Sequence, residues 1–188
     1  MARVTGRFGL SRFEADEYYQ LALDAYKKGR YDVAINNLND AISLMSNRAE
    51  LYAARGFIYL EDGVKDKAQA DFQQAIKLFP LEMLAHYGRG MIAYNDKNWD
   101  EAIAHFTDAY KSDPKRPETL YYLALAYHRK GTHEVARRIM ENAYSAFPDS
   151  DKRKNDAQRW MKEFDKIVGN KDTPAIPPPT TPSQPLLP

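Results

Sequence analysis

Apolar and small residues recur along this chain with the spacing of amphipathic helices, and the arrangement repeats every 34 residues. Three columns of the repeat hold small residues: Ala22, Gly56, Gly90 and Ala124 in the first, Ala34, Ala68, Ala102 and Ala136 in the second, and Ala41, Ala75, Ala109 and Ala143 in the third. A further column is large and apolar, with Leu38, Phe72, Phe106 and Met140. Four columns in one register indicate a structural unit present in four copies.

Each unit contains two helical stretches separated by a short polar turn, with the sequences KKGRYD, EDGVKD, NDKNWD and RKGTHE. Glycine or asparagine in these turns can supply the left-handed residue that ends a helix. The pattern predicts four helical hairpins, over residues 15–28 with 31–45, 49–62 with 65–79, 83–96 with 99–112 and 117–130 with 133–146. The small residues have a packing role, because two helices approach closely only where one lacks a bulky side chain and an aromatic ring fills the adjoining space.

The columns resemble the tetratricopeptide repeat, whose unit has a small residue at its eighth position, alanines at its twentieth and twenty-seventh and a proline near its thirty-second. The resemblance covers four consecutive units, 15–48, 49–82, 83–116 and 117–148. It implies an all-α fold, a right-handed α-solenoid of stacked hairpins, with a concave groove that is lined by the first helix of each pair and holds a peptide or protein segment. The chain departs from the family pattern in local turn positions, at Ser46, Lys65, Lys97 and His133.

Three segments flank the repeats. Residues 1–14 form a basic N-terminal arm, and residues 149–169 predict a capping helix with Trp160, Met161, Phe164, Ile167 and Val168 on roughly one face. Residues 170–188 contain seven of the eleven prolines and predict an extended tail. Within the tail, prolines at every third position match the turn of a polyproline II helix and predict a docking ridge, formed by Pro179, Pro182, Pro185 and Pro188.

Composition narrows the possible functions. The chain of 188 residues, 44% of them hydrophobic, is long enough to bury a core, and its formal net charge of +1 gives no general attraction to nucleic acid or to an anionic membrane. It contains no cysteine, which excludes disulfides and thiolate chemistry. Neither a signal peptide nor an apolar run of membrane-spanning length is present. We therefore expect a cytoplasmic protein that neither binds nucleic acid nor inserts into a membrane.

No combination of residues suggests an active site. The histidines fall in different columns of the repeat, and no pair has the spacing of a helical zinc site: His86, His105, His128 and His133. Glu101 and His105 share a helix face, which we interpret as a surface hydrogen-bonded pair rather than a catalytic one. We expect no enzymatic activity, no catalytic residue, no metal and no cofactor.

The resemblance also implies which side chains face the groove. They are Tyr19, Leu23, Tyr26, Phe57, Leu60, Tyr87, Met91, Tyr94, Tyr121, Leu125 and His128, with Tyr122 beside them. Aromatic faces suit proline rings and extended backbones, because they combine flat apolar area with hydroxyl groups that bond to carbonyls. The alternative is that these tyrosines pack between adjacent repeats.

Some members of the family hold the acidic tails of heat-shock chaperones with a clamp of lysine, asparagine and arginine. The positions that would supply this clamp hold other residues here, namely Tyr19, Leu23, Ala54, Leu84 and Gly88. We therefore do not expect a receptor for chaperone tails.

Two classes of function remain. In the first, the chain is an interaction scaffold that binds an extended segment of another protein in its groove. In the second, it is a self-assembling structural subunit whose proline-rich tail or N-terminal arm docks on a neighbouring copy, so that its partners are its own copies in an oligomer or filament.

Overall fold

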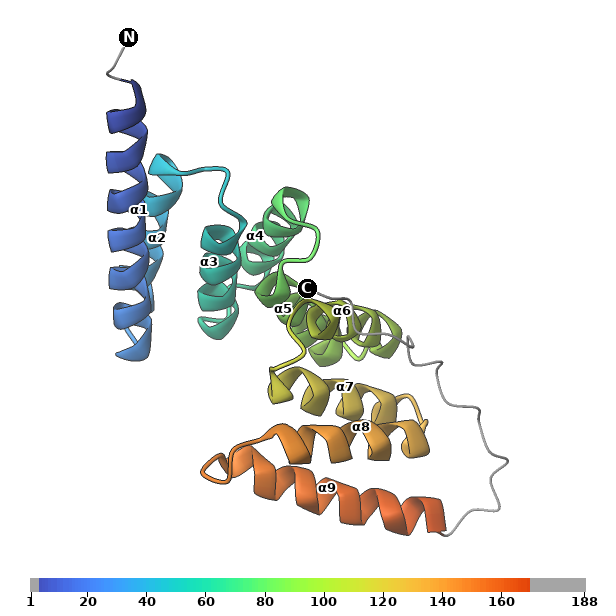
Figure 1. The fold of residues 1–188 in the computed structure, drawn as a ribbon. Coiled ribbons are helices and arrows are strands. Elements are labelled where there is room, and N and C mark those ends of the chain that lie inside the picture. The colour runs from blue at the N-terminus through green and yellow to red at the C-terminus, as the bar shows by residue number, and fades with distance from the viewer. Residues whose placement is uncertain (1–3, 170–188) are drawn as a thin grey trace.

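The computed structural model describes residues 4–169, and all regular secondary structure in this part of the chain is helical (Figure 1). The helices form four pairs and a final single helix. Their bounds are α1 Val4–Lys27, α2 Tyr31–Leu44, α3 Ala49–Glu61, α4 Lys65–Leu78, α5 Met83–Asn95, α6 Trp99–Ser112, α7 Pro117–Arg129, α8 His133–Ala146 and α9 Lys152–Gly169.

The pairs are the predicted hairpins, and they stack in chain order. Each hairpin packs on the next, and α9 packs on α8 at the end of the stack. In Figure 1 the helix axes turn progressively, from the upright α1 and α2 to the nearly horizontal α7, α8 and α9. The molecule is an all-α repeat solenoid, as the sequence predicts.

Helix bounds within the repeats agree with the prediction to within one residue, whereas the flanking helices differ. We expected the first helix to begin at residue 15, but α1 begins at Val4, so residues 4–14 of the presumed arm are helical. No proline interrupts this segment, and the packed positions Ala15 and Ala22 anchor the turns that follow it. At the other end, α9 begins at Lys152, because the Asp151 carboxylate accepts a hydrogen bond from the Arg153 backbone N–H at 2.9 Å and caps the helix.

The hairpin turns share one backbone conformation. The left-handed residue has φ of 70° at Gly29, 80° at Gly63 and 90° at Gly131, and in the third turn it is Lys97, at 61°. The expectation that an asparagine fills this role in the third turn is therefore wrong. The register of the repeat fixes which residue of the turn is left-handed, and in the third turn that residue is Lys97. The nearby asparagines lie elsewhere: Asn95 is the last residue of α5, and Asn98 is the residue before α6.

Helical glycines lie beneath buried aromatic rings. A Cβ atom on Gly88 would lie 2.1 Å from the Phe72 ring, and one on Gly90 would lie 2.6 Å from the ring of Phe106. Both phenylalanine rings are fully buried. The contact distances require glycine at these two helical positions, so the alternation of large and small residues is a packing pattern.

Candidate functional site

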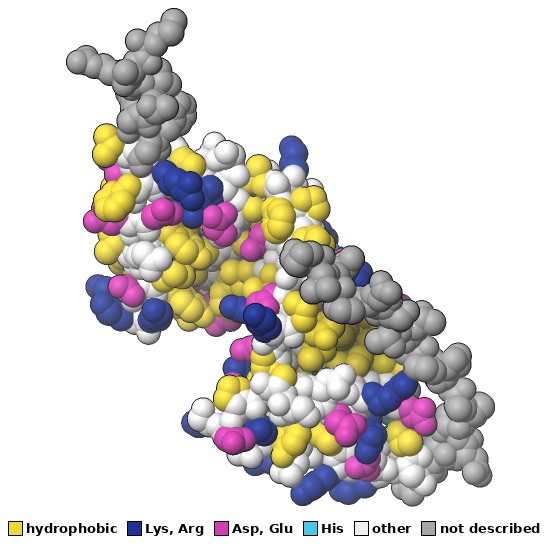
Figure 2. Space-filling model, in the orientation of Figure 1, with side chains coloured by type: hydrophobic (Ala, Val, Ile, Leu, Met, Phe, Trp, Pro, Cys, Tyr) yellow, Lys and Arg dark blue, Asp and Glu magenta, His cyan; other side chains and the backbone are white. Residues whose placement is uncertain are grey.

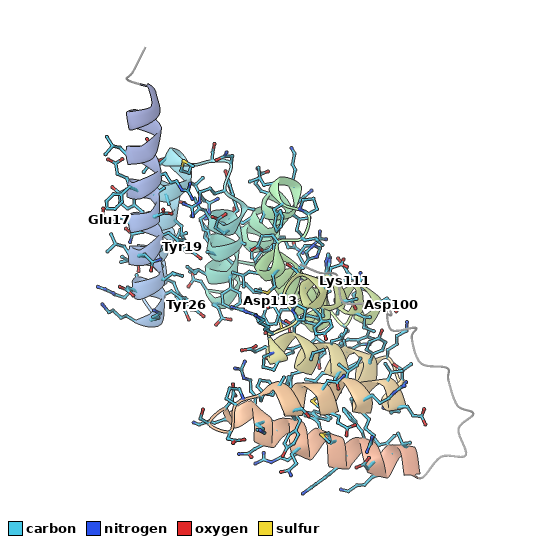
Figure 3. The ribbon with its side chains drawn as sticks, viewed as in Figure 1. Glu17, Tyr19, Tyr26, Asp100, Lys111 and Asp113 are labelled. Atoms are coloured by element: carbon cyan, nitrogen blue, oxygen red, sulfur yellow. The ribbon has the colours of Figure 1, made fainter. Side chains whose placement is uncertain are left out.

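The predicted groove residues form four stripes, one on the first helix of each hairpin. On α1 the stripe consists of Tyr19, Leu23 and Tyr26, which are spaced i, i+4 and i+7 and therefore share a helix face. All three are half-buried. Figure 3 shows Tyr19 and Tyr26 projecting from α1 toward α3, whereas Glu17 projects from the opposite side of the helix.

Aromatic contacts join stripes on neighbouring helices. The ring of Tyr26 on α1 meets that of Phe57 on α3 edge to face, with centroids 6.1 Å apart. Tyr122 on α7 meets Tyr87 at 6.0 Å and Tyr94 at 6.3 Å, both on α5. Leu60 on α3 and Met91 on α5 complete these stripes, and both are half-buried. The structure therefore brings the predicted residues of α1, α3, α5 and α7 together in two groups.

The stack curves so that this surface is concave. Burial raises the pKa of Tyr26 on α1 and of Tyr122 on α7, and the Glu61 carboxylate at the end of α3 contributes to both increases. One side chain of the second hairpin is thus within electrostatic range of both the first and the fourth hairpins. Figure 2 shows the molecule hollowed between α1–α4 and α7–α9, with hydrophobic side chains along the upper wall.

The hydroxyls of four groove tyrosines remain protonated at neutral pH, namely Tyr19, Tyr26, Tyr87 and Tyr122. Burial raises the pKa of Tyr87 far above its usual value, and Tyr122 and Glu118 add to the increase. Burial also raises the pKa of Tyr19, with Glu50 and Glu82 as further causes. A neutral hydroxyl both donates and accepts a hydrogen bond, so these groups can pair with the C=O and the N–H of an extended backbone.

The stripe on α7 lies against α9 instead of standing open. The His128 ring is 5.3 Å from the Trp160 ring and 5.1 Å from the Phe164 ring, and Leu125 is only 8% exposed. Tyr121 packs on Phe147 with ring centroids 6.2 Å apart. The final helix occupies the place that the first helix of another hairpin would take, so Tyr121, Leu125 and His128 pack between elements. The four prolines of the predicted docking ridge, Pro179, Pro182, Pro185 and Pro188, lie outside the described residues.

The fold brings all four histidines together in two pairs, although they belong to different columns of the sequence. The Nδ1 atoms of His86 and His105 are 3.1 Å apart, and those of His128 and His133 are 2.9 Å apart. His86 Nε2 lies 2.9 Å from the Pro80 carbonyl oxygen, so it carries a proton and its Nδ1 accepts from His105.

Each histidine pair joins the two helices of one hairpin. His105 Nε2 lies 3.7 Å from the Glu101 carboxylate, beyond hydrogen-bond distance, and Glu101 instead pairs with Arg89 at 3.3 Å. The predicted Glu101–His105 hydrogen bond is therefore not formed. Within residues 4–169, no group of three or more His, Cys, Asp or Glu side chains could hold a metal ion. None of the helices described is both long and apolar enough to cross a membrane.

One surface feature has no counterpart among the predicted residues. A hollow of about 390 Å³ lies beside the groove where the α2–α3 and α4–α5 connections meet, and its walls combine apolar and acidic side chains. The lining residues are Asn47, Arg48, Ala49, Glu50, Leu78, Phe79 and Glu82. Arg48 in its wall pairs with Asp16, which lies one turn before Tyr19 on α1, so the hollow adjoins the stripe on α1. Its residues belong to different columns, and no periodic pattern in the sequence points to it.

Comparison with known proteins supports the repeat assignment. Family models described as "Tetratricopeptide repeat" match residues 53–117 and 98–151, and one described as "TPR repeat" matches residues 22–63. Tetratricopeptide repeat protein 16 of Mus musculus is 30% identical over 120 residues, which are 60% of this chain and 15% of that protein. The chain therefore spans only a small part of the length of this relative.

Solved structures share the fold at low sequence identity. The Pseudomonas aeruginosa pilF structure has a TM-score of 0.75 at 17% identity, and the match covers 85% of this chain and 71% of that one. YrrB, described as a TPR protein with an unusual peptide-binding site, has a TM-score of 0.60 at 22% identity over 79% of this chain and 74% of its own. With the repeat columns, the stacked hairpins and the family models in agreement, the chain belongs to the tetratricopeptide repeat family.

Proposed function

We propose that this chain is a non-enzymatic interaction scaffold that holds an extended peptide or protein segment in the groove lined by α1, α3, α5 and α7. The observation that carries the proposal is the row of half-buried aromatic side chains on the concave face. Half-buried rings on a concave face leave part of their apolar surface accessible, and clustered accessible apolar surface marks interaction sites. The peptide-binding site ascribed to YrrB agrees with such a use of the fold.

The proposed binding surface excludes the residues that α9 covers. It consists of Tyr19, Leu23, Tyr26, Phe57, Leu60, Tyr87, Met91, Tyr94 and Tyr122, which are all half-buried. An extended segment leaves its backbone polar groups unpaired, and the neutral tyrosine hydroxyls offer partners for them. The aromatic faces offer apolar area for proline rings or aliphatic side chains.

The same surface disfavours acidic chaperone tails as ligands. Of the positions that would hold the clamp, Ala54 is buried and Gly88 lies against the Phe72 ring, so neither presents a cation to the groove. Tyr19, Leu23 and Leu84 are uncharged. The proposal is therefore an apolar groove with hydrogen-bonding edges.

Selection of a random dodecapeptide library on the full chain tests this proposal. We expect enriched peptides, and we expect the double substitution Tyr26→Ala with Tyr94→Ala to weaken their binding by at least about tenfold, because it removes two aromatic anchors. Binding is measured by fluorescence anisotropy, and far-UV circular dichroism establishes that the variant is folded.

The matched control is Phe13→Ala, which removes an aromatic ring that is 70% exposed on another face of α1. Peptide affinity should not change in this variant. An absence of enriched peptides, or equal affinities for the wild type and the double variant, would contradict groove binding.

A further inference from the structure

The hollow between the α2–α3 and α4–α5 connections combines an apolar surface with uncompensated negative charge. Phe79 is 54% exposed, although it is a large hydrophobic residue, and Leu78 beside it is half-buried. Glu50 and Glu82 line the same hollow. An apolar surface that ends at carboxylates is complementary to a side chain with an aliphatic stem and a cationic end.

The connection that carries Phe79 is held in place by the third hairpin. His86 bonds to the carbonyl oxygen of Pro80 at 2.9 Å. Ser112 at the end of α6 donates its hydroxyl proton to the carbonyl oxygen of Leu81. Two side chains of the third hairpin thus fix the backbone of Pro80 and Leu81, directly after the exposed ring, so this wall of the hollow is preorganised.

The charges around the hollow do not balance. Arg48 pairs with Glu50 at 2.7 Å and also with Asp16 on α1. Its single guanidinium is thus shared between two carboxylates. Among the described residues no cationic side chain forms an ion pair with Glu82, so the group as a whole is deficient in positive charge.

Glu82 is already held in a position suited to receive a cation. Its Oε2 atom accepts the backbone N–H of Ala85 at 2.6 Å and caps α5. This bond stabilises the charged form, yet burial and then the nearby Glu50 raise the pKa of Glu82. The carboxylate would therefore be stabilised by a positive group that enters the hollow.

We propose that the hollow receives a lysine or arginine side chain of the segment bound in the groove, with its stem on Phe79 and its charge between Glu50 and Glu82. This inference rests on the proposed function, because Tyr19 connects the hollow to the groove and the basic residue must belong to the same extended segment. The hollow then gives the groove a preference for a basic residue beside α1.

The dodecapeptide selection on the full chain, taken further, tests this preference. We expect enriched peptides to share a lysine or arginine at one position. Replacing that residue by methionine, which keeps the apolar length and removes the charge, should weaken binding by about tenfold in fluorescence anisotropy. The same replacement should have little effect on binding to the Glu82→Gln variant, since the pairing carboxylate is then gone.

Glu82→Gln keeps a side-chain oxygen that can cap α5, and thermal melts establish that it is folded. Glu50→Gln offers a second variant with the same expected loss. The matched control is Glu17→Gln, which removes an equal charge from the opposite side of α1 (Figure 3) and should leave affinity unchanged.

The possible outcomes separate the two proposals. If peptides are enriched but share no basic position, or if the methionine replacement weakens binding to the wild type and to Glu82→Gln equally, the hollow is not a cation pocket and the groove proposal stands. If no peptide is enriched, the groove proposal fails, and the pocket fails with it.

Discussion

At the scale of single residues, the hairpin turn imposes its backbone conformation whatever side chain it receives. Lys97 adopts φ of 61° where glycine occupies the other three turns. A left-handed non-glycine residue costs about 1–2 kcal/mol, although glycine loses more conformational entropy on folding. The third turn is therefore strained, and a glycine at position 97 would relieve the strain.

We expect Lys97→Gly to raise the free energy of unfolding by about 0.5–1 kcal/mol, because it relieves this strain. Urea unfolding followed by circular dichroism measures the change. The reverse variant, Gly131→Lys, introduces the same strain in the fourth turn and should lower the free energy of unfolding by a similar amount. Equal stabilities for wild type and Lys97→Gly would show that the turn is unstrained.

At the scale of elements, the packing of one helix on another depends on the alanines that are buried between them. Ala102 on α6 is fully buried, whereas Ala104 on the same helix is exposed. We expect Ala102→Leu to lower the free energy of unfolding by about 1–3 kcal/mol through overpacking. Ala104→Leu makes the same chemical change on the solvent side and should have almost no effect. Indistinguishable thermal melts for the two variants would mean that the repeat register is wrong.

The two histidine pairs make the third and fourth hairpins sensitive to acid. Burial lowers the pKa of His105, with Arg89 and His86 as further causes and Glu101 and Asp108 opposing them. Burial likewise lowers the pKa of His128, beside His133. A depressed pKa in the folded state means that the unfolded chain binds protons first, at about pH 6.5. Their contribution to stability is present above that pH and lost as the pH falls through the depressed values.

We expect the free energy of unfolding to fall between pH 7.5 and 5, with each histidine contributing at most about 1.4 kcal/mol per pH unit. His105→Asn with His128→Asn should flatten this dependence, because asparagine cannot take up a proton there. The raised pKa of Glu82 acts in the opposite direction, since protonation stabilises its folded form as the pH falls. The comparison of wild type with variant separates the two effects, and parallel pH profiles would contradict the assignment to histidine.

At the scale of the whole molecule, the outer face of α1 combines charged side chains with exposed apolar ones, namely Leu10, Phe13 and Leu21. Leu51, Ala54 and Ile58 on α3 are buried against the preceding hairpin. The equivalent positions of α1 hold polar side chains that are exposed, namely Glu17, Gln20 and Asp24. An end-to-end filament built by continuing the solenoid would bury these charges unpaired, which is costly.

We therefore expect the full chain to remain a monomer in light scattering over a wide concentration range, and a chain that ends at Gly169 to behave identically. Burial of the Glu17 and Asp24 charges opposes end-to-end stacking, and groove binding requires no self-association. Assembly by the full chain alone would instead show that residues 170–188 dock on a neighbouring copy. The structural-subunit alternative would then replace the scaffold proposal.

Much of the candidate site was accessible from the sequence, because the family resemblance implies which repeat positions face the groove, and helical periodicity places Tyr19, Leu23 and Tyr26 on one helix face. The sequence did not reveal that α9 covers His128 on the fourth stripe. Periodicity states which residues share a helix face, but it does not state which other element packs against that face. The hollow at Glu82 was missed for the same reason, since its walls come from two separate connections.

The sequence by itself determined the all-α class, the repeat register and the helix bounds within the repeats. These features depend on contacts within one repeat unit, such as that of Phe72 with Gly56. Only the tertiary structure decided which faces stay open, how the four histidines pair, and where Glu50 and Glu82 meet Phe79. These outcomes depend on the rotation of each hairpin relative to the next. That rotation is set by interhelical packing angles, which no local sequence pattern specifies.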